Sequence, residues 1–79
     1  MTDMNAAEIL PTITTVDQNT GRQITWNVVH VAEHADPAKA KGFTHMIGMV
    51  RPKGRRSYMI HAEMIGDVIV RHTTPLQVF

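Results

Sequence analysis

Cysteine is absent from this chain of 79 residues. Its absence excludes disulfide bonds and every metal site that depends on thiolate ligands. A domain of this length buries only about 60–65% of the surface that its unfolded chain exposes, so its core alone gives marginal stability. Small folds without disulfides usually gain stability from a metal or from self-association. We therefore keep a homodimer or a higher homo-oligomer as a hypothesis.

Long apolar runs are also absent. No stretch approaches the about 18–20 apolar residues of a membrane span, and the first ten residues lack the basic segment of a signal peptide. We therefore predict a cytoplasmic protein with no membrane partner, which fits the lack of cysteine because reducing compartments disfavour disulfides. The apolar fraction of 43% is ordinary for a folded chain, and we predict one small domain over residues 1–79.

Familiar catalytic motifs are missing as well: there is no G-x-S-x-G, no Walker loop and no G-x-G-x-x-G. The acidic residues are scattered, and no pair of them has a spacing that indicates one site. So short a domain has little room for a deep pocket unless two subunits build one together. We therefore expect a non-enzymatic protein without a cofactor. A small enzyme would require a concave intersubunit pocket that contains both His45 and His61.

Two parts of the chain differ in composition. Residues 1–10 are rich in helix formers and predict an N-terminal arm or a short helix that ends at Pro11. Residues 12–79 are dominated by Thr, Val and Ile and predict a β-domain. Its expected strands are 12–16, 24–31, 44–50, 57–65 and 68–70, with a short edge strand after Pro75.

Turn signals separate these strands. Between the second and third strands, Asp36 and Pro37 can begin a single helical turn that Gly42 closes. The segments QNTGR (18–22) and RPKGR (51–55) both place glycine fourth. This pattern predicts a three-residue hairpin loop, in which a type I turn is followed by a left-handed glycine that forms a G1 bulge.

The turn at 51–55 fixes an expected register for the second hairpin, with Arg51 opposite Arg55, Gly48 opposite Tyr58 and His45 opposite His61. One face would then be mostly apolar and form the core; its members are Met46, Val50, Tyr58, Ile60, Ala62 and Met64. The other face is mixed and too apolar for a purely solvated surface. Its candidates for a protein interface are Phe43, His45, Ile47, Met49, Met59 and His61.

The second expected strand is irregular, because Ile24, Trp26 and Val28 alternate on one side while Val29 and Val31 continue on the other. Either a bulge near residues 27–29 or burial on both faces explains this pattern. Bulges increase twist, and small barrels need twist to close. The predicted fold is therefore mainly β, or α+β with a short N-terminal helix. It is a five- to six-stranded antiparallel, strongly bent sheet or small half-open barrel built on two type I and G1 bulge hairpins.

Half of the eight basic residues lie within six positions, at Arg51, Lys53, Arg55 and Arg56, although the net charge is only +1. Arginine offers planar, bidentate donors that suit phosphate, and aromatic side chains nearby can stack on bases. Tyr58, Trp26 and Phe43 are the candidates for that contact. The alternative is a well-solvated turn, because charged loop tips also keep strand edges apart.

The five histidines raise the question of a metal site. His45 and His61 are expected to oppose each other, and Glu63 could add an oxygen ligand. However, no cysteine and no H-E-x-x-H motif is present, so we expect no metal. Half-buried strand histidines or a pH-sensitive interface are the alternatives.

These observations lead to two hypotheses of different classes. The first is a binding protein that engages nucleic acid or a nucleoprotein surface through the basic hairpin 51–56. The second is a protein-binding or homo-oligomeric module that uses the Ile47, Met49 and Met59 face. A short basic hairpin on a bent sheet is similar in general form to several small nucleic-acid-binding barrels. It is also similar to small phage or plasmid accessory proteins that block a larger host complex, and architecture alone does not decide between them.

Overall fold

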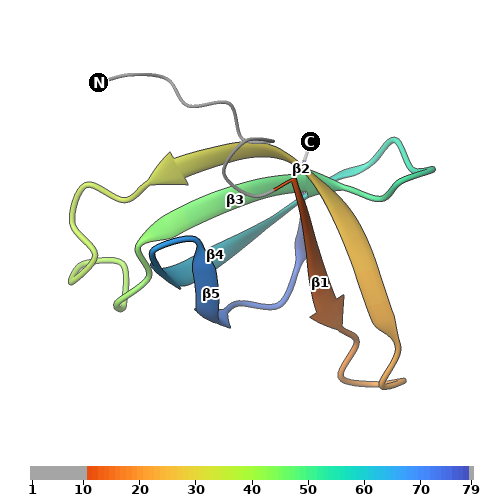
Figure 1. Ribbon diagram of the computed structural model, residues 1–79, viewed down its shortest axis with the longest axis horizontal. Coiled ribbons are helices and arrows are strands. Elements are labelled where there is room, and N and C mark those ends of the chain that lie inside the picture. The colour runs from red at the N-terminus through yellow and green to blue at the C-terminus, as the bar shows by residue number, and fades with distance from the viewer. Residues whose placement is uncertain (1–10, 79) are drawn as a thin grey trace.

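Six antiparallel strands and no helix make up residues 11–78, which are the residues described by the computed structural model (Figure 1). The strands are β1 (Thr12–Val16), β2 (Gln23–Glu33), β3 (His45–Val50), β4 (Ser57–Ile65), β5 (Val68–His72) and β6 (Leu76–Val78). The mainly β prediction is confirmed. The arm or helix predicted for residues 1–10 lies outside the described residues. No helix within residues 11–78 has the length and apolar character needed to cross a membrane.

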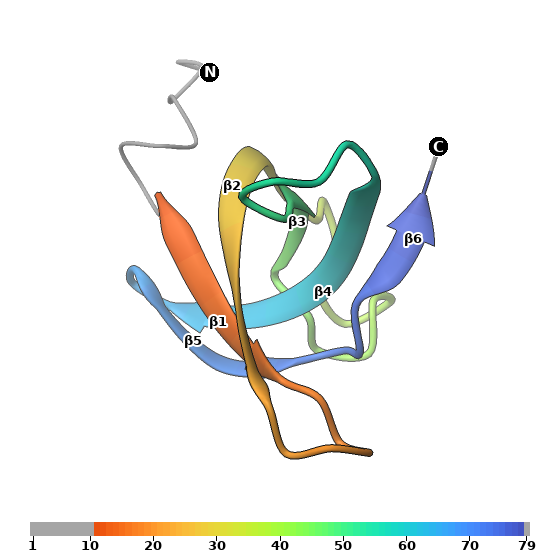
Figure 2. The same cartoon turned by 90° about the vertical axis from the view of Figure 1, so that its right-hand side faces the viewer.

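The sheet follows the order β1-β2-β3-β4-β5, and β6 joins it by pairing with β4. Strand β4 therefore has partners along both edges: β3 on one side, and β5 and β6 on the other. Residues 62–65 pair with β5, whereas residues 57–59 pair with β6. The sheet curls around its inner face into a half-open barrel (Figure 2), as the sequence predicts.

The core forms where the curl brings one face of each long strand together. Alternate residues are buried in β1, β3 and β4, as expected for strands with one face turned inward. The buried apolar cluster consists of Ile13, Trp26, Val28, Ile47, Met49, Ile60, Ala62 and Met64. Thr15 is the buried polar residue of the described chain, and its hydroxyl accepts a hydrogen bond of 2.8 Å from Trp26 Nε1.

A bulge interrupts β2 where the sequence predicts it. The pairing of β2 with β3 shifts between Val28 and His30, so Val29 is the extra residue. The side chain of Val29 is exposed, whereas Val28 is buried and Val31 packs against the core. The bulge, rather than burial of both faces, therefore explains the irregular apolar pattern of this strand.

The predicted register of the β3–β4 hairpin is wrong by one residue. Ile47 lies opposite Ile60, Gly48 opposite Met59 and His45 opposite Ala62. The reason is the loop, which contains six residues (51–56) between Val50 and Ser57 rather than three. Its turn is closed by a hydrogen bond of 2.9 Å from Gly54 N to Arg51 O, and Gly54 does not have the positive φ of a G1 bulge.

This shift reverses the faces of β3, because successive side chains of a strand point to opposite sides. Ile47 and Met49 have no exposed surface and belong to the core, whereas Met46 and Val50 are only partly buried. The prediction that Ile47 and Met49 form an exposed interface is therefore wrong. The β4 half of the predicted core is correct, since Ile60, Ala62 and Met64 are buried and Tyr58 packs against them.

Tyr58 does not cover Gly48, as the predicted register required. It lies opposite Met49 on β3 and Gln77 on β6. The space beside Gly48 is instead occupied by His30 of β2, because a side chain at Gly48 would begin 3.3 Å from His30 Cβ. The glycine therefore permits a close approach of β2 and β3.

The β1–β2 turn is close to its prediction. Gly21 has the left-handed φ of 73° that the pattern requires. The loop contains four residues rather than three, because Asp17 N donates to Arg22 O at 2.8 Å. The Asp17 carboxylate orders this loop by accepting hydrogen bonds from the backbone nitrogens of Asn19 (2.8 Å) and Thr20 (3.3 Å).

The expected helical turn between β2 and β3 is present as a single turn. Asp36 Oδ1 accepts a hydrogen bond of 3.1 Å from Ala38 N, as an N-capping side chain does. Gly42 ends the turn with a φ of 86°, and its nitrogen donates to Pro37 O at 2.8 Å. This segment carries the chain back to β3.

We predict that Thr15→Val destabilises the fold by about 1–3 kcal/mol, because the buried Trp26 Nε1–H loses its acceptor while the side-chain volume is kept. Chemical unfolding followed by Trp26 fluorescence measures the change. Thr14→Val is the matched control, since Thr14 is the exposed neighbour on the same strand. Equal effects of the two substitutions would contradict the assigned role of Thr15.

Candidate functional site

The four clustered cations lie on the basic loop, residues 51–56, which connects β3 to β4 at one end of the barrel (Figure 1). All four side chains are exposed; they are Arg51, Lys53, Arg55 and Arg56. None of them forms an ion pair with an acid among residues 11–78, where the ion pair between an arginine and an acid is Arg71–Glu63. Arg51 and Arg55 are not cross-strand neighbours as predicted, because both belong to the loop. The structure therefore gathers these charges on one loop without neutralising them.

Arg51 connects this loop to the core. Its guanidinium carbon lies 5.9 Å from the centre of the Trp26 ring, within the range of a cation–π contact. Tyr58 covers Trp26 as well, with the ring centres 4.9 Å apart and the planes tilted by 56°. Trp26 is only 3% exposed. It is therefore not available to stack on a ligand, as the sequence suggested, but it holds Arg51 in place.

A concave pocket of about 370 Å³ lies beside Arg51. One wall is the β1–β2 hairpin, and the other is the last residue of β5 with the segment that follows it. Trp26, Arg51 and Tyr58 lie between the two walls. The hairpin contributes Thr15, Val16, Asp17, Gln18, Asn19 and Ile24, and the opposite wall contributes His72, Thr74 and Pro75. The pocket thus combines apolar side chains, amides, hydroxyls, one guanidinium, one imidazole and one carboxylate.

The side-chain amides of Gln18 and Asn19 are free to meet a ligand. In the side-chain hydrogen bonds of this hairpin loop, Asp17 Oδ1 and Thr20 Oγ1 accept from backbone nitrogens. Neither amide has a hydrogen-bond partner among the described residues. Sequence reasoning missed this pocket, because its walls are about fifty positions apart along the chain and meet only when the sheet curls.

The predicted His45–His61 pair does not form. His61 lies opposite Met46 and contacts His34 instead, with His34 Nε2 and His61 Nδ1 3.0 Å apart and the rings stacked. His45 Nδ1 lies 2.7 Å from Thr44 Oγ1. Glu63, the expected oxygen ligand, is hydrogen bonded to Arg71. Within residues 11–78 no three His, Asp or Glu side chains are grouped so as to hold a metal ion, and the pocket contains neither His45 nor His61.

The remaining members of the predicted interface are half-buried rather than exposed. Phe43 is covered by Arg71, whose guanidinium carbon lies 4.0 Å from the ring centre, and by His61 at 6.1 Å. Met59 pairs with Gly48 on β3 and Leu76 on β6. Large exposed apolar side chains occur elsewhere, and those of the described chain are Val16, Val29, Ile65, Val68, Val70 and Leu76.

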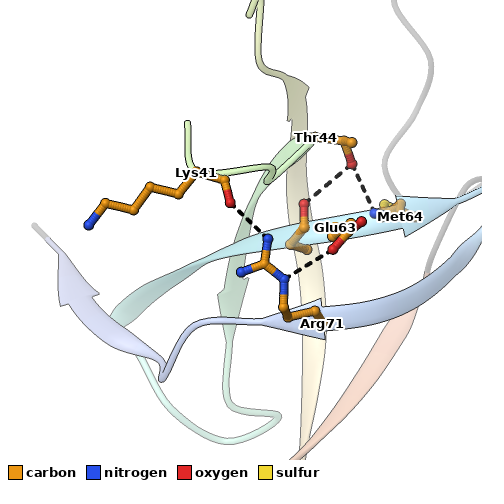
Figure 3. Close-up of polar contacts among 6 residues, drawn as sticks. Lys41, Thr44, Glu63, Met64 and Arg71 are labelled. Carbon is orange, nitrogen blue, oxygen red and sulfur yellow. Dashed lines mark hydrogen bonds and ion pairs between the residues drawn. The ribbon is translucent and has the colours of Figure 1, made fainter. Parts of the chain in front are cut away.

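Arg71 has a structural role, which separates it from the basic loop (Figure 3). Its guanidinium donates to Glu63 Oε1 at 3.0 Å and to the backbone oxygen of Lys41 at 2.9 Å. Gly42 allows this approach, because a side chain there would begin 3.0 Å from Arg71 Nη2. Thr44 adds a second attachment, since its hydroxyl donates to Ala62 O (3.3 Å) and accepts from Met64 N (2.9 Å). These bonds fasten the β2–β3 connection to β4 and β5.

No protein-family model matches this chain, and comparisons with curated proteins and with solved structures give no match either. A function must therefore be inferred from the chemistry of the loop and the pocket. The loop offers unneutralised positive charge, and the pocket offers a mixed polar and apolar cavity next to it.

We predict that Arg71→Ala lowers the free energy of unfolding by about 1–2 kcal/mol, through loss of the bond to the Lys41 carbonyl and of the contact with Phe43. The ion pair with Glu63 adds little, because its side chains are 47% and 37% exposed and solvent screens them. Thermal and chemical unfolding measure the change. Arg22→Ala removes the same charge from an exposed turn position and is expected to leave the free energy of unfolding nearly unchanged. If Arg22→Ala destabilises the fold as much as Arg71→Ala does, the contacts of Arg71 are not the cause.

Proposed function

We propose that this chain is a small binding protein that engages nucleic acid, free or within a nucleoprotein, through the basic loop. The observation that carries the proposal is the set of four exposed cations on six consecutive residues, none of them paired with an acid among residues 11–78. Like charges so close together repel each other, and phosphates relieve that repulsion. Arginine also binds phosphate through two parallel hydrogen bonds.

The positions of the other cations also favour the basic loop as the binding surface. Arg71 is engaged with Glu63 and Lys41, and Lys39 and Lys41 lie in the β2–β3 connection at the opposite end of β3. With a net charge of only +1, the chain has no general attraction for polyanions. Binding is therefore expected to be local to residues 51–56. The proposal keeps the cytoplasmic location that the sequence predicts.

We predict that Arg55→Ala combined with Arg56→Ala weakens oligonucleotide binding about tenfold or more at low salt and reduces the slope of log K against log salt by about 2, because each phosphate contact contributes about 1. Fluorescence anisotropy of a labelled oligonucleotide over a salt series provides the measurement.

The matched control is Lys39→Ala with Lys41→Ala, which removes the same charge at the opposite end of β3. It is expected to leave the salt slope unchanged. The proposal fails if no oligonucleotide binds at low salt, or if the loop variant and the control weaken binding equally.

A second candidate function is self-association, favoured by the edge of the sheet rather than by the face that the sequence indicated. Among residues 11–78, strand β5 pairs only with β4, and exposed apolar side chains lie on and beside it: Ile65 (68% exposed), Val68 (58%) and Val70 (51%). A second copy of β5 in antiparallel register about Ile69 would place Val68 opposite Val70 of that copy. Pairs of β-branched residues are favourable across strands.

For this candidate we expect a concentration-dependent dimer by sedimentation or light scattering, and Val68→Lys should convert it to a monomer by placing charge on the edge. Val29→Lys is the control, since Val29 is equally exposed (56%) on an interior strand. A wild-type chain that stays monomeric at high concentration would eliminate this candidate.

A further inference from the structure

We propose that the pocket beside Arg51 receives an unpaired nucleobase, so that the nucleic acid held by the basic loop is single-stranded. This inference rests on the proposed function, because it assigns a class of nucleic acid to the same surface. It differs from that function in a testable respect, since phosphate contacts alone give no preference for a single strand over a duplex or a base-free backbone.

The first argument is position. Arg51 belongs both to the basic loop and to the lining of the pocket, so a phosphate on the loop lies next to the cavity. The guanidinium carbon lies 5.9 Å from the centre of the Trp26 ring, which places the charge at the edge of the pocket. A strand whose backbone follows the loop would therefore present its next base to the pocket.

The second argument is size. A pocket of about 370 Å³ falls at the lower end of the range of about 300–1,000 Å³ that is typical of sites for small organic ligands. It can admit one planar ring system, whereas a duplex is too wide to enter. A base that is paired and stacked in a duplex would first have to flip out, at a cost that an unpaired base does not incur.

The third argument is the chemistry of the walls. Ile24, Tyr58 and Pro75 offer apolar and aromatic surface for the faces of a base. The amides of Gln18 and Asn19 each carry a donor and an acceptor, which is the combination that base edges present in return. The Asp17 carboxylate lies on the same wall, and its Oδ1 accepts hydrogen bonds from the backbone nitrogens of Asn19 and Thr20. A purely anionic ligand would leave both amides and the apolar wall without a partner.

The molecule carries its own reporter for this site. Trp26 is the single tryptophan of the chain, and it lines the pocket while remaining 3% exposed. Occupation of the pocket should therefore change its emission, whereas phosphate binding farther along the loop, at Arg55 and Arg56, should not. The same titration followed by anisotropy of a labelled strand reports binding regardless of where it occurs.

The experiment compares four probes at low salt: a twelve-nucleotide single strand of mixed sequence, its duplex, an abasic strand of the same length, and poly-glutamate. We expect the single strand to bind about tenfold or more tightly than the duplex or the abasic strand, because one stacked base contributes roughly that much. We also expect only the single strand to alter the emission of Trp26. Poly-glutamate is expected to bind no better than the abasic strand.

The variant that tests the pocket is Gln18→Ala with Asn19→Ala, which keeps the basic loop intact. It is expected to reduce single-strand affinity several-fold, because the hydrogen bonds to the base are lost while the apolar wall remains, and to leave duplex binding unchanged. Gln23→Ala with Asn27→Ala is the matched control, because it removes two exposed amides of β2 that do not line the pocket. All four positions are exposed, and circular dichroism confirms that each variant is folded.

The outcomes separate the two proposals. If single strand, duplex and abasic strand bind equally and all depend on Arg55 and Arg56, the basic loop is a phosphate site and the assignment of the pocket is overturned. If no oligonucleotide binds, or if poly-glutamate binds as tightly as the single strand, the proposed function itself is overturned and the pocket assignment with it. A single-strand affinity that Gln18→Ala with Asn19→Ala leaves unchanged would also overturn the pocket assignment.

Discussion

The pairing of β4 with three strands is the constraint on which the rest of the structure depends. One edge of β4 pairs with β3, while the other edge pairs with β6 near its start and with β5 near its end. The strand bends along its length, and the sheet curls with it (Figure 2). The curl encloses the core around Ile47 and Ile60, and it brings the β1–β2 hairpin and the segment after β5 together as the walls of the pocket.

The polar side-chain contacts are distributed unequally between the two ends of β3. At one end of β3, Arg71 and Thr44 tie the β2–β3 connection to β4 and β5 (Figure 3). The basic loop lies at the other end of β3. Among the described residues, one of its cations contacts the body of the domain: Arg51, which lies over the Trp26 ring. Charge that serves the fold is therefore neutralised, whereas the charge of the loop remains available to a ligand.

Much of the fold was predictable because it depends on local chemistry. Strand composition, the left-handed Gly21 and the bulge at Val29 all follow from short stretches of sequence. The register of β3 and β4 did not follow, because it depends on the length of the loop between them, and one residue of error exchanged the inner and outer faces of β3. The basic loop was visible in the sequence, but the pocket was not, since it needs contacts between residues that are far apart along the chain.

The contact between Arg51 and Trp26 couples the surface of this domain to its interior. In a domain this small, the side chain that begins the basic loop also shields a core ring, so the order of the loop and the integrity of the core are not independent. A ligand that fixes Arg51 against Trp26 binds the folded chain and not the unfolded one, and by mass action it raises the melting temperature. Binding of a ligand at the basic loop therefore increases the thermal stability of the whole domain.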